Sequence, residues 1–318
     1  MDAADVVSAA PKLESSERVA RLEPPDRHVE IVLDTDANNE IDDQFALVYA
    51  YLAPSIDLEA VYAAPFHNSR STGPADGMAQ SLEEIHHLLE RLDHPDPEAD
   101  AYAGAKRYLT EIEHPESTRA TEDLIERARD RPSEDPLYVV AIGAPTNVAA
   151  AIARAPEIVK NIVVVWLGGQ PHHWHAATEF NLMQDPAASR VLFDSGVPLV
   201  QVPCKQVAEQ LRTTIPEVRF HLRGKGPVAE YLADITEAYT DDPNAVWSSV
   251  IWDIATIGYL RNPDWTPSHL ADSPILTDQL TYSHDRTRHA IRVVHDVNRD
   301  RVFGDLFDLI TDTQPGQS

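Results

Sequence analysis

Residues 29–43 have the sequence VEIVLDTDANNEIDD, in which an apolar run leads into five acidic side chains between positions 34 and 43. The run from Val29 to Leu33 is typical of a buried strand, and the apolar residues from Ile41 to Leu52 recur at helical spacing. The acids therefore lie on a turn from a strand into a helix. In an open α/β sheet, such a turn falls at the carboxyl edge of the strand, where these folds bind their ligands.

The acidic turn predicts a bound cation. Close carboxylates raise one another's pKa, so a folded chain that gathers several of them needs a positive charge among them. Asp42 and Asp43 have a simpler explanation, because the helix dipole favours acids in the first turn of a helix. That explanation does not reach Asp34 and Asp36 at the strand end. We therefore expect a metal or polar-ligand site in preference to helix capping alone.

The composition argues against nucleic acid as a partner. The 318 residues include 52 acids and 26 bases, and the net charge of -26 would repel the phosphates of nucleic acids. No apolar stretch is long enough to span a membrane and no signal-peptide pattern is present, so a soluble, cytoplasmic protein is expected. The acid excess and the scarcity of lysine are typical of adaptation to high salt. The single cysteine, Cys204, excludes an intramolecular disulfide.

Apolar runs alternate with segments of helical periodicity along most of the chain. This alternation predicts an α/β fold with an open, mostly parallel, Rossmann-like sheet flanked by helices on both faces. Residues 29–318 are expected to form a single catalytic domain. Residues 1–28 lack strong periodicity and predict a poorly ordered or draped extension, with a short helix from Glu14 to Arg21 as the alternative. The runs expected as strands are 29–33, 58–64, 137–142, 162–167, 198–202 and 290–297.

Polar residues follow several of these strands. Asn68 comes after the second run, Thr146 and Asn147 come after residues 137–142, and Glu179 and Asn181 lie beyond residues 162–167. Parallel strands end at the same edge of a sheet, so we expect Asn68 to lie on the same edge as Asp36. Asn68 also has an ordinary explanation as a turn former, and Thr146 or Asn147 as a helix cap.

Taken in order, these motifs resemble those of the inosine/uridine-preferring nucleoside hydrolases. The shared elements are Asp-x-Asp followed by Asp-Asp, then Thr-Asn after the strand 137–142, then Glu-Phe-Asn and Asp-Pro-x-Ala at residues 179–188. The resemblance covers most of residues 29–260. It implies a nucleoside hydrolase-like fold, a Ca²⁺ cofactor, a small-molecule nucleoside substrate and a homodimer or homotetramer. The implied reaction is hydrolysis of the N-glycosidic bond of ribonucleosides.

The resemblance also implies residue roles. The ion would lower the pKa of its water, and Asp36 would take the proton as general base. The Ca²⁺ ligands implied are Asp36, Asp43, Asp253 and the backbone carbonyl of Thr146. The substrate-binding residues implied are Asp42, Asn38, Asn39, Asn68, His173, Glu179, Asn181 and Trp252.

The chain departs from the family pattern in three places. Five residues, 37–41, separate Asp36 from the Asp pair, which is a longer gap than the family usually has. Trp252 stands where a His commonly protonates the leaving base, and an indole that stacks on a purine would favour purine nucleosides. His173 stands where an Asn is common. It belongs to the His-rich run 172–175, for which a transition-metal site is the weaker alternative because adjacent loop positions do not converge easily.

Two other functions compete with this prediction. A haloacid-dehalogenase phosphatase also begins with a strand and Asp-x-Asp, but its motif needs Thr or Val where this chain has Asn38. A non-catalytic nucleoside- or ribose-binding protein would use the same site, and the presence of Asp36, Asp43 and Asp253 favours the hydrolase over it.

Overall fold

The computed structural model describes residues 10–111, 114–132 and 134–312. Its main sheet has eight strands in the order β3-β2-β1-β4-β5-β6-β12-β9, and it is open at both edges. All neighbouring strands are parallel except β9 and β12. The predicted open, mostly parallel sheet is therefore confirmed. The strands are β1 (Val29–Thr35), β2 (Ile56–Ala63), β3 (Ala101–Ala103), β4 (Leu137–Ala141), β5 (Ile162–Leu167), β6 (Leu199–Val202), β9 (Ser268–Asp272) and β12 (Ala290–Val294).

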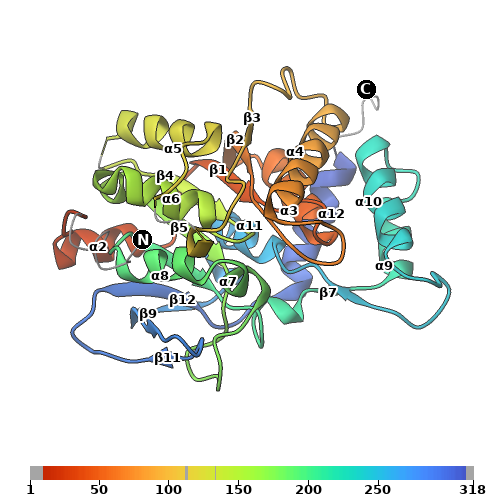
Figure 1. Cartoon of the computed structure of the whole chain (residues 1–318). Coiled ribbons are helices and arrows are strands. Elements are labelled where there is room, and N and C mark those ends of the chain that lie inside the picture. Colours follow the sequence, from red (N-terminus) through yellow and green to blue (C-terminus); the bar gives the residue numbers. More distant parts are fainter. Residues whose placement is uncertain (1–9, 112–113, 133, 313–318) are drawn as a thin grey trace.

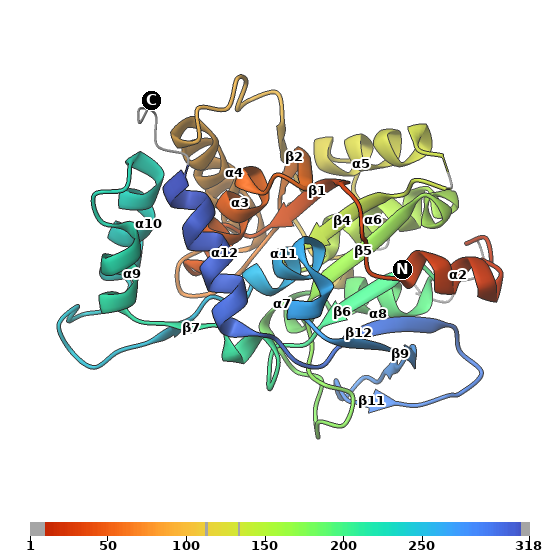
Figure 2. The same ribbon diagram turned by 180° about the vertical axis from the view of Figure 1, so that it is seen from behind.

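Helices cover both faces of this sheet (Figures 1 and 2). Alternate residues of β1 serve the two faces, since Ile31 and Leu33 belong to one apolar core and Val32 belongs to the other. The first core includes α3 (Asp42–Leu52), α4 (Pro74–Arg91), α9 (Ile215–Leu222), α10 (Pro227–Ala238), α11 (Ile254–Arg261) and α12 (Arg299–Asp312). The second includes α5 (Arg119–Asp130), α6 (Thr146–Arg154) and α8 (Pro186–Asp194).

The strand order changes direction beside β1. From β1 the chain runs through α3 to β2 on one side, whereas β4 to β6 follow on the other side. In such sheets the helices diverge where the order reverses, and a crevice opens at the carboxyl ends of the two strands. The segments that follow Thr35 and Ala141 therefore meet at the predicted ligand-binding edge.

Shorter elements complete the fold. None of the helices in the described ranges has both the length and the apolar character needed to cross a membrane. The short elements are α7 (Phe180–Gln184), the pair β7 (Arg212–Thr213) with β8 (Ser249–Val250), the pair β10 (Ile275–Leu276) with β11 (Tyr282–Ser283), and the 3-10 helices η1 (Leu109–Glu111), η2 (Pro156–Lys160), η3 (Ala208–Gln210) and η4 (Pro263–Trp265).

The amino-terminal segment is more ordered than its composition predicts. Residues Ser15–Leu22 form the helix α2, close to the alternative expected from Glu14 to Arg21, and the poorly ordered extension is contradicted there. Leu22 is fully buried, and its carbonyl accepts a hydrogen bond from Arg292 Nε on β12. These contacts come from residues far along the chain, so local periodicity did not reveal them. Residues 1–9 lie outside the described part.

Candidate active site

A cavity of about 240 Å³ lies at the carboxyl edge of the sheet, where the crevice was expected. The segments that follow β1, β4, β5 and β6 contribute to it, together with the starts of α3, α7 and α11. Its lining residues are Asp36, Asn39, Glu40, Asp42, Asp43, Ile142, Leu167, Gln170, Glu179, Phe180, Asn181, Cys204, Lys205, Trp252 and Asp253.

Three carboxylates converge on one side of this cavity. One oxygen from each of Asp42, Asp43 and Asp253 lies within 4.8 Å of the others, and all three residues are buried. Asp42 and Asp43 open α3, and Asp253 is the residue before α11, so the positive ends of two helix dipoles face the cluster. Burial, followed by the neighbouring acids, raises the pKa of Asp42 and of Asp253 well above the usual range.

Asp36 completes the acidic cluster. Its side chain is almost fully buried, and its Oδ2 atom has no hydrogen-bond partner. Burial raises the pKa of Asp36 well above its usual value, and the charges of Asp43 and Asp42 raise it further. Gly143 allows this placement, because a Cβ atom there would lie 2.9 Å from Asp36 Oδ1. An unpartnered buried carboxylate oxygen is costly, and a cation would relieve the cost.

Asp34 is set apart from the cluster. It belongs to β1 and is fully buried, and its Oδ1 accepts a hydrogen bond of 2.7 Å from Asn147 Nδ2. Burial raises the pKa of Asp34 to about 7. The first acid of the Asp-x-Asp pattern therefore braces the strand ends, while the second reaches the cavity.

Glu179 and Asn181 also line the cavity and are held in place by hydrogen bonds. Glu179 caps α7, and its two carboxylate oxygens accept hydrogen bonds from the backbone N–H groups of Gly169, Asn181 and Leu182 at 2.9, 3.0 and 3.1 Å. The Asn181 amide donates to the carbonyls of Ile142 and Leu167 at 2.8 and 3.1 Å. A carboxylate and an amide fixed side by side suit the vicinal hydroxyls of a sugar.

Ile142 occupies the place that sequence analysis gave to Thr146. Thr146 begins α6 and does not line the cavity, and its hydroxyl donates to Asp185 Oδ2 at 2.9 Å. Ile142 is the first residue after β4, and its carbonyl lies against Asn181 at the cavity wall. The end of the apolar run 137–142 was a usable signal, because the residue just past a parallel strand lies at the carboxyl edge.

The two asparagines of the longer turn have different positions, since Asn39 lines the cavity and Asn38 does not. Asn39 lines the cavity, and its Oδ1 accepts a hydrogen bond of 2.6 Å from Asn68 Nδ2, so Asn68 supports the site through Asn39. Asn38 does not line the cavity, and it has a φ angle of 92°. Its amide donates to Gln80 on α4 at 3.3 Å. The extra length of the turn therefore directs Asn38 away from the ligand.

Trp252 and His173 line two different cavities. Trp252 is half-buried and lines the cavity, with Lys205 Nζ 5.8 Å from its ring centroid. His173 lines a different cavity of about 210 Å³, where its Nε2 lies 3.0 Å from Gln206 Oε1. In the ranges that the structure covers, the trio Asp42, Asp43 and Asp253 is the group whose ligand atoms converge for a metal, and the histidines 172–175 do not join it.

Sequence analysis missed several residues of the cavity wall. Gln170 follows β5, and Cys204 and Lys205 follow β6, so each of them comes shortly after the end of a parallel strand. Their position just after a predicted parallel strand, which also indicated Asp36, could have identified them. Glu40, Leu167 and Phe180 were also not assigned to the site and line it.

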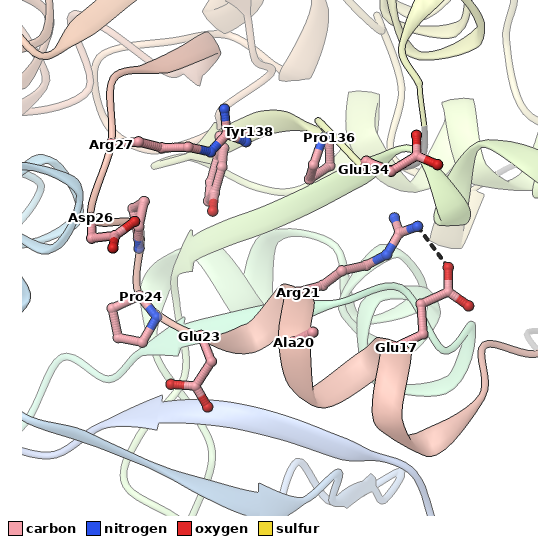
Figure 3. Close-up of a pocket in the computed structure, with 11 residues that line it drawn as sticks. Glu17, Ala20, Arg21, Glu23, Pro24, Asp26, Arg27, Glu134, Pro136 and Tyr138 are labelled. Atoms are coloured by element: carbon pink, nitrogen blue, oxygen red, sulfur yellow. Dashed lines mark hydrogen bonds and ion pairs between the residues drawn. The ribbon is translucent and has the colours of Figure 1, made fainter.

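A second cavity, near α2, is a separate feature. It has a volume of about 480 Å³ and lies between α2, the segment that leads into β1, and the segment before β4 (Figure 3). Its charged residues include Glu17 and Arg21, which pair with each other at 2.7 Å, and Arg27, which pairs with Asp135. It lies near the amino ends of β1 and β4, so the acidic cluster and the ligand-binding edge are remote from it.

The fold and the site together define an α/β protein with a buried cluster of carboxylates that could hold a metal ion, beside a carboxylate and an amide that suit the hydroxyls of a sugar. Comparison with known sequences gives the family: the model of the inosine-uridine preferring nucleoside hydrolases matches residues 31–304, and the chain belongs to that family. It is therefore an N-glycosidase that hydrolyses ribonucleosides, in a metal-dependent family, and the phosphatase alternative is set aside.

Individual relatives agree with this assignment. The chain is 27% identical over 263 residues to the pyrimidine-specific ribonucleoside hydrolase RihA of Enterobacter sp. (strain 638), covering 74% of this chain and 79% of that one. Among solved structures, a plant nucleoside hydrolase, PpNRh1, matches with a TM-score of 0.73 and 20% identity over 89% of this chain and 99% of that one. A purine-preferring ribonucleoside hydrolase from Gardnerella vaginalis matches with a TM-score of 0.73 and 22% identity, over 89% and 98%. The two structures support the fold.

Proposed function

We propose that this enzyme is a Ca²⁺-dependent ribonucleoside hydrolase that prefers purine nucleosides. The observation that carries the proposal is that the acids Asp36, Asp42, Asp43 and Asp253 line one cavity together with the hydrogen-bonded pair of Glu179 and Asn181. The first group suits a cation and the second suits a ribose, and the cavity brings them within reach of one small ligand.

The donor set fits a hard divalent ion. Ca²⁺ binds oxygens at about 2.3–2.6 Å, so two ligands of one ion are separated by at most about 5 Å. The 4.8 Å limit met by Asp42, Asp43 and Asp253 agrees with this geometry. Of these three acids we assign Asp43 and Asp253 as ligands and leave Asp42 to the ribose. Asp36, whose Oδ2 has no hydrogen-bond partner, and the carbonyl of Ile142, in place of the expected Thr146, are the other assigned protein ligands. When bound, the ion supplies a water of lowered pKa.

Other steps, which are proton transfer and binding of the ribose, are assigned to side chains of the protein. Asp36 accepts the proton of the attacking water as general base. Asp42, Asn39, Glu179 and Asn181 hold the ribose hydroxyls, and the carboxylates favour the positive charge that develops on the ring as the glycosidic bond lengthens. Asn68 keeps Asn39 in place. These roles need fixed side chains, which the hydrogen bonds of Glu179, Asn181 and Asn39 provide.

Trp252 supports the purine preference. Its indole lines the cavity and offers a flat apolar surface on which a bicyclic base gains more stacking area than a single ring does. Relatives of this chain include both pyrimidine-specific and purine-preferring enzymes, so this residue carries the argument.

The test is release of free ribose from inosine, guanosine, adenosine, uridine and cytidine. We expect wild-type activity that is lost with a chelator and restored by Ca²⁺, and a fall in kcat of about 10³-fold in Asp36→Asn, within the range of general-base contributions. Asp130→Asn, at an exposed position of α5, is the matched control and should keep full activity. A folded wild-type enzyme that releases no ribose from any nucleoside would overturn the proposal, and equal rates for purine and pyrimidine nucleosides would overturn the role of Trp252.

A further inference from the structure

The cavity contains one positive charge among many negative ones. Its lining includes six carboxylate residues and, in the part of the chain that the structure describes, a single cationic side chain, that of Lys205. Neither the acidic cluster nor the wall formed by Glu179 and Asn181 makes use of this charge. A lysine in an acidic site therefore needs its own explanation. The six acids are Asp36, Glu40, Asp42, Asp43, Glu179 and Asp253.

The backbone of Lys205 is held in place. Its N–H donates to Gln170 Oε1 at 3.0 Å, while Gln170 Nε2 donates to the carbonyl of Thr178 at 2.9 Å. The N–H of Cys204 donates to the carbonyl of Gly169 at 3.1 Å. These bonds join the segment after β6 to the segment after β5, and they fix the point from which the lysine side chain extends.

The ammonium group of Lys205 lies beside the surface proposed for the base. Nζ is 5.8 Å from the centroid of the Trp252 ring and 2.9 Å from Glu209 Oε1. The side chain is 43% exposed, so it can move along the ring at low cost. An ammonium carries three N–H donors, and Glu209 takes one of them. The others remain for an acceptor that lies over the indole.

We propose that Lys205 donates a hydrogen bond to the leaving base and selects nucleosides whose base carries a carbonyl at purine C6 or pyrimidine C4, as in hypoxanthine, guanine and uracil. This inference rests on the proposed function. With the ribose held by Glu179 and Asn181, the base projects toward Trp252, and an N–H of Lys205 donates to its carbonyl oxygen. Adenine and cytosine present an amino group at that position. Two donors then face each other, and a site built for one partner strongly rejects the other.

The same contact assists the reaction. As the C1′–N bond breaks, its electron pair moves onto the base, while the oxygen of water bonds to C1′ and its proton passes to Asp36. The ammonium of Lys205 stabilises the negative charge that spreads to the carbonyl oxygen, and the released base takes up a proton from solvent. A donor aimed at developing charge contributes mainly to the transition state, so its loss lowers kcat more than it raises KM.

A phosphate group is the other acceptor that a lysine could bind, and the surroundings disfavour it. Six carboxylates line the same cavity of about 240 Å³, and they would repel a dianion far more than one ammonium attracts it. Neutral nucleosides therefore fit the charge distribution better than nucleoside 5′-monophosphates do.

The experiment compares wild type, Lys205→Met and Lys205→Arg on inosine, uridine, adenosine and cytidine. We expect Lys205→Met to lower kcat/KM by about 30- to 100-fold for inosine and uridine, and to leave it unchanged or raise it for adenosine and cytidine, because the opposing donor is removed. Lys205→Arg should restore part of the loss. Glu209→Gln, which keeps the ammonium and removes its partner, should preserve the ratio of carbonyl to amino substrates, and Lys225→Met on the connection between α9 and α10 serves as the matched control.

Three results would overturn the inference. One is an equal loss on all four nucleosides in Lys205→Met, which would mean a structural role. Another is an unchanged kcat/KM on all four nucleosides in that variant, which would mean that Lys205 does not contact the base. The third is faster hydrolysis of inosine 5′-monophosphate than of inosine, which would assign Lys205 to phosphate. Thermal unfolding with and without Ca²⁺ confirms that each variant is folded. A wild-type enzyme inactive on every nucleoside would instead refute the proposed function itself.

Discussion

The carboxylate of Asp42 is buried beside those of Asp43 and Asp253, and the pKa of each is raised. A raised pKa means that the folded chain binds more protons than the unfolded chain, so stability falls as the pH rises through the folded-state value. For Asp43 that value is about 7. Without a cation, the protein should therefore lose stability between about pH 4, where free carboxyls ionise, and neutral pH.

Asp42→Asn tests whether the crowded carboxylates destabilise the metal-free protein. The substitution removes one buried charge, so at pH 7 the metal-free variant should unfold at a higher temperature than metal-free wild type, with a gain on the order of 1–3 kcal/mol. Calorimetric melting in the presence of a chelator measures this gain. Asp241→Asn, an exposed position, should leave the melting temperature unchanged. A metal-free Asp42→Asn protein less stable than wild type would contradict the account.

At the scale of elements, Asn147 joins the ends of neighbouring strands. From the first turn of α6, its Nδ2 donates to Asp34 Oδ1 at 2.7 Å and to the carbonyl of Ala63 at 3.1 Å. Its Oδ1 accepts from the N–H of Ala105 at 2.7 Å. Gly104 makes this approach possible, because a Cβ there would lie 2.1 Å from the carbonyl of Ala63. One amide thus connects the segments that end β1, β2 and β3.

Asn147→Leu should destabilise the fold strongly. It preserves the approximate shape of the side chain and leaves a buried carboxylate, a carbonyl and an N–H without partners, at a cost of about 3 kcal/mol or more. Urea unfolding measures the loss. Asn244→Leu provides the comparison at an exposed site, where a change within about 0.5 kcal/mol is expected. A loss at Asn147 no larger than that at Asn244 would show that the connection is dispensable.

The elements that sequence patterns predicted well are those buried by neighbouring strands. The runs 137–142 and 162–167 correspond to β4 and β5 almost residue for residue, because fully buried parallel strands consist of continuous apolar residues. The antiparallel β9 at the sheet edge was not predicted. Its pattern is mostly exposed, and its pairing with β12 is set by residues about 20 positions later. The contact between Leu22 and Arg292 joins residues still further apart.

The residues of the site likewise divide into those that sequence motifs indicate and those that they do not. Asp36, Asp42, Asp43, Glu179 and Asp253 lie in motifs that could be recognised, and the structure brings them to one cavity. Ile142 contributes a backbone carbonyl, which any residue type could supply, so no side-chain motif indicates it. His173 shows the converse limit, because a loop residue can be placed by sequence order and still face a neighbouring cavity.

At the scale of the whole molecule, the net charge of -26 should make stability depend on salt. Self-repulsion among surface acids opposes the compact state, and raising the ionic strength from 0.15 M to 1 M shortens the screening length from about 8 Å to about 3 Å. We expect the melting temperature to rise by roughly 3 °C, which corresponds to about 2 kcal/mol for a chain of this size.

A triple variant isolates the contribution of surface charge. Glu83, Glu98 and Glu126 are exposed, and their replacement by Gln should reduce the salt-dependent gain while leaving catalysis intact. Melting curves recorded in KCl and in an uncharged osmolyte separate screening from general solvent exclusion. Equal gains in the two cosolutes, or the same salt response in the variant, would count against adaptation of this chain to high salt.

The opposition between charge crowding and stability at Asp36, Asp42, Asp43 and Asp253 has an evolutionary consequence. A mutation of one of these acids to its amide would raise the stability of the metal-free fold. Without selection for catalysis, such mutations would therefore be favoured and the cluster would be lost. A protein that had become a passive binder would therefore not be expected to keep all four. Because keeping all four costs stability unless an ion is bound, their joint presence is what we expect of a chain that uses the proposed metal centre.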